Sequence, residues 1–114
     1  MHKYGRFTLT LLDGREVKVT ANYMLLSKLR DTNKAVYQHY NEAFKDLNTE
    51  PDYSMAMIFY AAYITGLIDD GKDLKEAIPE EEFLDLLPFD RPSNMELVRK
   101  LVAPNQAKAS TKRS

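Results

Sequence analysis

The stretch SMAMIFYAAYITGLIDD, residues 54–70, decides the fold. The sixteen residues from Tyr53 to Ile68 carry no charge, although charged residues make up 29% of the chain. A segment this apolar is a membrane span, a buried central helix, or a helix that holds another molecule. The uncharged run is shorter than the roughly 20 residues that a bilayer requires. Asp52 and Asp69 flank it, where a membrane helix favours Lys, Arg or Trp, so we expect no membrane partner.

A helix over this stretch is apolar on two sides. One stripe at helical spacing holds residues 55, 58, 59, 62 and 66, and another holds residues 57, 60, 61, 64, 67 and 68. One stripe supplies the core. The second is covered either by the neighbouring elements or by a partner, and Met and Tyr suit a surface that repacks. Its candidate partner-binding residues are Met57, Tyr60 and Ile64.

Residues 7–20, FTLTLLDGREVKVT, alternate like two strands that close at Asp13-Gly14. A two-residue loop would place Leu9 opposite Lys18 and would mix apolar and polar side chains on each face. A three-residue loop, residues 12–14, keeps the apolar side chains together and gives Gly14 the left-handed conformation of a bulged turn, so we predict it.

In that register Leu9 faces Val17 and Phe7 faces Val19. An isolated hairpin is marginally stable, so its apolar face must lie on helices or on another chain. The same face therefore supplies the other candidate partner-binding residues: Phe7, Leu9, Val17 and Val19.

Two apolar patterns follow the hairpin. Asn22 or Thr20 caps a helix that runs to about Arg30, and its apolar side holds Leu25, Leu26 and Leu29. DTN at residues 31–33 offers a new start, so the region is either one bent helix or two. The second part carries an amphipathic stripe: Val36, Tyr37, Tyr40, Phe44 and Leu47.

Further breaks divide the remaining helices. NTEPD, residues 48–52, precedes the central helix, whose end is marked by Gly66 and Gly71. After a connector, residues 79–87 predict a short acidic helix. SNME, residues 93–96, reads as a capping box in which Ser93 caps the last helix and Glu96 reaches back. The apolar face of that helix holds Met95, Leu97, Val98, Leu101 and Val102.

We therefore predict a mainly α fold with an N-terminal β-hairpin, a small helical bundle of four to five helices. Residues 1–103 form a single hairpin-plus-helices domain, because 114 residues suffice for one core. Residues 104–114 form a disordered basic tail, because they are polar, carry Lys108, Lys112 and Arg113, and lack large apolar side chains.

The sequence contains few of the residue combinations that catalytic or metal sites require. The chain has no cysteine, and its histidines, His2 and His39, lack a second ligand at metal-binding spacing. DDGKD at residues 69–73 lacks the spacing of a calcium loop, and no motif pairs a nucleophile with a base. We predict that the protein is not an enzyme and takes no cofactor.

The charges argue against nucleic acid as a partner. Sixteen Lys and Arg residues are scattered among seventeen Asp and Glu residues, whereas a nucleic-acid binder has a basic excess or face. The alternative function is a small helical DNA-binding regulator. Its candidate recognition helices, residues 22–30 and 94–102, hold only two basic residues each.

Five sequence segments, which correspond to the predicted hairpin and helices, follow one another over about residues 6–102. In order they are TLLDGREVKV, YMLLSKLR, AVYQHYNEAF, an apolar helix beginning IFYAAYI, and EEEFLDLLPFD. A short last helix and a Lys-rich polar end follow. This order, and the pairing of IFYAAY with EEFLDLL, resembles the tail assembly chaperones of long-tailed siphophages of Gram-positive hosts.

The resemblance implies a non-enzymatic protein that binds the long, hydrophobic tape measure protein and keeps it soluble during tail morphogenesis. It also implies a homo-oligomer, and a longer frameshifted form that recruits the tail tube protein. The expected location is the host cell cytoplasm, with the protein absent from the mature virion. The family carries no catalytic residues to transfer.

Overall fold

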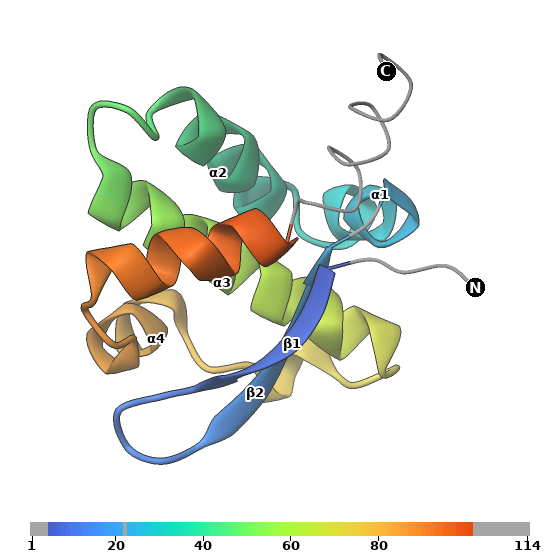
Figure 1. The fold of residues 1–114 in the computed structure, drawn as a ribbon. Helices are drawn as coiled ribbons and strands as arrows, with labels where there is room; N and C mark the ends of the chain where they lie inside the picture. Colours follow the sequence, from blue (N-terminus) through green and yellow to red (C-terminus); the bar gives the residue numbers. More distant parts are fainter. Residues whose placement is uncertain (1–4, 22, 102–114) are drawn as a thin grey trace, which may run out of the picture.

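A computed structural model describes residues 5–21 and 23–101 of the chain. The predicted tail at 104–114, Asn22 and Val102 lie outside the described residues. The described part confirms the predicted class, a hairpin followed by helices on a shared core (Figure 1). Its elements are β1 (Gly5–Thr10), β2 (Glu16–Ala21), α1 (Tyr23–Thr32), α2 (Lys34–Lys45), α3 (Pro51–Asp69), η1 (Leu74–Glu76), α4 (Glu80–Leu86) and a last helix at residues 91–101.

The hairpin adopts the predicted register. Phe7 pairs with Val19 and Leu9 pairs with Val17. The Leu11 N–H donates to the Arg15 carbonyl at 2.8 Å, which leaves residues 12–14 as a three-residue loop. Gly14 has φ +92°, the left-handed conformation that a bulged turn requires. The requirement that the apolar side chains share one face of the hairpin was therefore enough to predict a three-residue loop.

Helix α3 occupies the centre of the fold and packs against β2, α1, α2, α4 and η1 (Figure 1). Pro51 occupies its first turn, as predicted, where the missing N–H costs nothing. Ser54, Met55 and all residues from 57 to 66 are buried, so every face of its middle is enclosed. A helix that is apolar all round is expected at such a central position.

Gly66 does not mark the end of α3, so that prediction is wrong. The helix continues to Asp69, and Gly71, with φ +70°, lies just beyond it. Gly66 instead lets the backbone of β2 approach the helix: a Cβ at this position would lie 2.6 Å from the Lys18 carbonyl oxygen. Two residues further along β2 the main chain also contacts α3 directly, because the Thr65 hydroxyl donates to the Thr20 carbonyl.

The region after the hairpin forms two helices, not one bent helix. Asn33 caps α2, and its Oδ1 accepts the Val36 N–H at 3.2 Å. Thr20 lies within β2 and is not the cap of α1. Leu25 and Leu29 are buried as predicted. In the α2 stripe Val36 and Tyr40 are buried and Tyr37 and Leu47 are partly buried, but Phe44 is 37% exposed.

The last helix starts three residues earlier than predicted. Asp90, not Ser93, caps it: its carboxylate accepts the Ser93 N–H at 3.4 Å and the Ser93 hydroxyl at 3.1 Å. The predicted capping box is therefore wrong, and Glu96 instead accepts from Arg99 at 2.9 Å. Val98 and Leu101 are buried and Leu97 is partly buried, whereas Met95 is 47% exposed.

Three aromatic rings fix the connector and α4 onto α3. The Tyr60 hydroxyl donates to the Ile78 carbonyl at 2.9 Å, and the Tyr63 hydroxyl accepts the Ile78 N–H at 3.0 Å. Phe83 of α4 contacts both rings at 5.2 Å between centroids. Burial, then the charge of Glu80, raises the pKa of Tyr60 to about 12, so its hydroxyl remains a neutral donor.

Polar contacts hold the middle of β2 and the loop of the hairpin. Lys18 Nζ lies 2.6 Å from Asp69 Oδ2 and 2.8 Å from Asp70 Oδ1, at the end of α3. At the loop, the Leu12 N–H donates to the Leu86 carbonyl at 2.7 Å. These contacts supplement the apolar face that the hairpin buries on α3.

We predict that Gly66→Ala destabilises the protein. Replacing glycine by alanine inside a helix normally gains about 1 kcal/mol. Here the Cβ meets a backbone oxygen, and overpacking of this kind costs about 1–3 kcal/mol. We therefore expect Gly66→Ala to lower the unfolding free energy instead of raising it. The pair Gln38→Gly and Gln38→Ala, at an exposed position of α2, measures the ordinary propensity difference. Urea unfolding of the wild type and the three variants checks this, and a more stable Gly66→Ala protein would contradict the close approach.

We also predict an acid-sensitive contribution from Asp69. Hydrogen bonding from Lys18 lowers the pKa of Asp69 below 3.8. A depressed carboxyl pKa contributes stability that is complete above the unfolded value and is lost as the pH falls through the folded value. Between about pH 6 and pH 2, the unfolding free energy of the wild type should fall more than that of Asp69→Asn. Parallel pH profiles in urea titrations would show that the ion pair contributes nothing.

Candidate functional site

The structure places the predicted partner-binding residues in the interior of the chain. Met57, Tyr60 and Ile64 are each no more than 6% exposed, so the second stripe of α3 is covered. On the hairpin, Leu9 and Val19 are buried, and Phe7 and Val17 are partly buried against the same core. None of these seven residues forms an open surface in this conformation.

The second stripe of α3 is covered by other elements of the same chain. Strand β2 covers the end of α3 near Gly66, and Ile78 and Phe83 cover Tyr60. Met57 lies under α2, where it lines a hollow with His39 and other residues of that helix. Of the two alternatives left open by the sequence, cover by the neighbouring elements is the one observed.

The exposed apolar side chains lie elsewhere, and most of them surround the start of α3. Phe44 and Met95 line one hollow there, and Tyr53 and Phe89 line another. Tyr53 is 56% exposed and Phe89 is 80% exposed. An apolar cluster on a surface is a stronger indication of binding than single apolar residues.

We call the first hollow the apolar groove. It has a volume of about 280 Å³ and lies between the end of α2, the start of α3 and the last helix. Arg99 is its one charged residue, and that side chain is engaged by Glu96 at 2.9 Å. The residues that line it are Phe44, Leu47, Asn48, Pro51, Met55, Met95, Val98 and Arg99.

A bidentate ion pair positions the wall of this groove. Arg91, at the start of the last helix, donates to both oxygens of Asp52 in the first turn of α3, at 2.9 and 2.6 Å. These hydrogen bonds lower the pKa of Asp52 and raise that of Arg91. Two parallel hydrogen bonds fix orientation as well as distance, so the last helix is aligned relative to α3.

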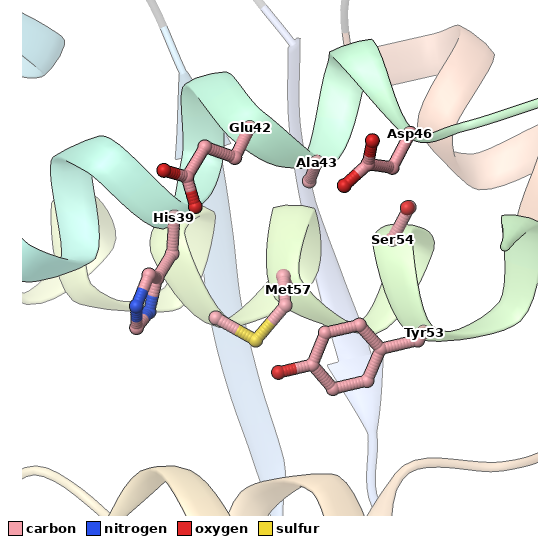
Figure 2. Close-up of a pocket in the computed structure, with 7 residues that line it drawn as sticks. All are labelled: His39, Glu42, Ala43, Asp46, Tyr53, Ser54 and Met57. Carbon is pink, nitrogen blue, oxygen red and sulfur yellow. The ribbon is translucent and has the colours of Figure 1, made fainter. Parts of the chain in front are cut away.

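A third, smaller hollow of about 150 Å³ lies between α2 and α3 (Figure 2). Figure 2 shows the carboxylates of Glu42 on α2 and of Asp46 just after it, with the Tyr53 ring and Met57 on α3. His39 Nδ1 lies 3.8 Å from Glu80 Oε1 and has no hydrogen-bond partner among the described residues. This hollow contains polar groups but no paired nucleophile and base.

Within residues 5–21 and 23–101, no group of three or more His, Cys, Asp or Glu side chains could hold a metal ion. The same part of the chain contains no helix with the length and apolarity needed to cross a bilayer. The absence of enzymatic activity stays a prediction.

Sequence reasoning missed the groove because it assigned two of its residues to the core. Phe44 and Met95 both fit helical stripes, but each lies at the edge of its stripe and remains exposed. For the neighbouring hollow the sequence does contain a signal, because Phe89 stands between Pro88 and Asp90, outside any periodic pattern. A large aromatic residue in such a loop has no helical neighbours to bury it.

Comparisons with protein-family models, curated proteins and solved structures found no match to this chain. The function is therefore argued from the geometry described above and from the sequence resemblance.

We predict that Phe89 contributes little to folding. Phe89→Ala should change the unfolding free energy by no more than about 0.5 kcal/mol, as for most exposed positions. The matched variant Phe83→Ala removes a fully buried ring and should cost about 3–5 kcal/mol. Urea denaturation measures both, and a large loss in Phe89→Ala would show that this ring is part of the core.

Proposed function

We propose that this protein is a phage tail assembly chaperone that binds amphipathic helices of a tape measure protein and keeps them soluble. The observation that carries the proposal is the apolar groove beside the start of α3. The order of the hairpin and helices, which resembles that of the siphophage chaperones, supports it independently.

The groove suits a helical ligand. Helix-in-groove recognition inserts apolar side chains at three- and four-residue spacing into a hydrophobic cleft between helices. Met95 and Phe44 supply flexible and aromatic contacts along this cleft, and buried Met55 forms part of its floor. Methionine adapts to different side chains because it is unbranched and polarizable. A chaperone that meets many segments of one long client needs such tolerance.

We place a separate chain in the groove and not residues 103–114. These residues contain no aromatic residue, leucine, isoleucine, valine or methionine, so they offer little to an apolar cleft. The groove volume of about 280 Å³ is at the low end for sites that enclose a small molecule. It fits a few side chains of a helix that lies across it.

One groove of this size gives weak binding, and the proposal therefore includes self-association. Several copies along one client convert later contacts into intramolecular ones and raise the overall affinity without new contacts. The same proposal places the protein in the host cytoplasm, outside the finished virion. It also includes recruitment of the tail tube protein by a longer frameshifted form.

Two methionine variants test the groove. Met95→Glu places a charge in the cleft, and Met24→Glu places the same charge at an exposed site on α1, outside it. Burying one such side chain is worth about 1.5–3 kcal/mol, so Met95→Glu should weaken client binding roughly tenfold or more. Met24→Glu should leave it unchanged.

The measurement is co-expression with a tape measure protein, followed by the soluble fraction of the client and the amount that co-elutes. Wild type and Met24→Glu should keep the client soluble and Met95→Glu should not. A client that stays insoluble with wild type would contradict the proposed function. Equal behaviour of the two variants would contradict the groove as the binding site.

A further inference from the structure

The main chain of β1 presents hydrogen-bonding groups outward at Thr8. Main-chain bonds in an antiparallel pair alternate, so residues two apart point the same way. Leu11 bonds to Arg15 across the hairpin, and Leu9 and Phe7 therefore also point at β2. Thr8 lies between them, points away from β2 and is exposed. In the described part of the chain the sheet has two strands only.

The opposite edge of the sheet is closed. The outward groups of β2 are those of Lys18 and Thr20, by the same alternation. The Lys18 carbonyl faces Gly66 at a distance that excludes a Cβ, and the Thr20 carbonyl accepts the Thr65 hydroxyl. Helix α3 therefore occupies this edge, and β1 lies on the other side of the sheet from it.

Strand β1 lacks the features that usually protect a free edge. Edge strands are commonly shortened or interrupted by proline, lysine or a bulge. Here the six residues GRFTLT contain neither proline nor lysine, and their pairing with β2 is continuous. Its one charged side chain, Arg6, is held by Asp69 at 3.1 Å. Among residues 5–21 and 23–101, the outward main chain of Thr8 is thus accessible to another strand.

We propose that β1 pairs with β1 of a second copy of this chain, antiparallel and centred on Thr8. In that register the outward main chain of Thr8 bonds to Thr8 of the second copy, and Arg6 lies opposite Thr10. On the apolar face Phe7 lies opposite Leu9, which extends one hydrophobic surface across both hairpins. The two Arg6 residues are separated by four positions, roughly 14 Å, which is beyond the screening length of about 8–10 Å.

This pairing closes after two copies. A two-stranded hairpin becomes a four-stranded sheet, which is more stable than an isolated hairpin. The outer strands of that sheet are the two β2 strands, and both are covered by α3. No edge is left to propagate, so the product is a two-fold dimer and not a filament. The inference specifies the self-association in the proposed function but does not depend on what occupies the groove.

Thr8→Pro tests the pairing, with Thr8→Val as its matched control. Proline removes the outward N–H, which the hairpin itself does not use, and is tolerated on edge strands. Valine retains the N–H and favours a strand. Sedimentation equilibrium over a range of concentrations should show a dimer for wild type and Thr8→Val. The dissociation constant of Thr8→Pro should rise at least tenfold.

Wild type that is monomeric at every concentration would overturn the proposal, as would assembly beyond two copies or an unchanged Thr8→Pro. If the proline variant fails to fold by circular dichroism, hydrogen exchange of wild type decides instead. The Thr8 amide should exchange more slowly at dimer-forming concentrations, and a concentration-independent rate would overturn the pairing. If dimerisation fails while the client remains soluble, only the pairing is wrong.

Discussion

The approach of the β2 main chain to α3 at Gly66 is the constraint on which the rest of the structure depends. A glycine at that point lets a strand edge lie directly on a helix, with the Lys18 carbonyl where a side chain would otherwise stand. The hairpin is thereby positioned to bury Leu9 and Val19 and to bring its loop to α4. The same contact closes the β2 edge of the sheet, while Thr8 on the opposite strand is exposed in the described part of the chain.

The packing of neighbouring elements against α3 limits which parts of this helix are accessible. The middle of the helix is enclosed on all sides, because β2, α1, α2 and α4 all pack against it. Burial is incomplete at the two ends of the helix: Tyr53 is exposed in the first turn, and Leu67 and Ile68 are only partly buried in the last. The most apolar helix therefore acts as the scaffold, and the proposed binding surface is formed by its N-terminal end and the elements around it.

Features that depend on local pattern could be predicted from the sequence. Alternation of Phe7, Leu9, Val17 and Val19 determined the register, and Pro51 indicated the start of α3. Features that depend on tertiary approach could not. Gly66 looks like a helix end because its strand neighbour is 48 residues away in sequence, at Lys18. The groove was missed for the same reason, since its walls come from three separate helices.

The central claim is that a client helix binds in the apolar groove and not on the buried stripe of α3. Methyl NMR of the methionines during titration with an amphipathic tape measure peptide tests it directly. The account predicts that Met95, which is exposed in the groove, shifts strongly, while buried Met57 and exposed Met24, both outside the groove, change little. Shifts centred on Met57, or saturating peptide with no shift at Met95, would contradict it.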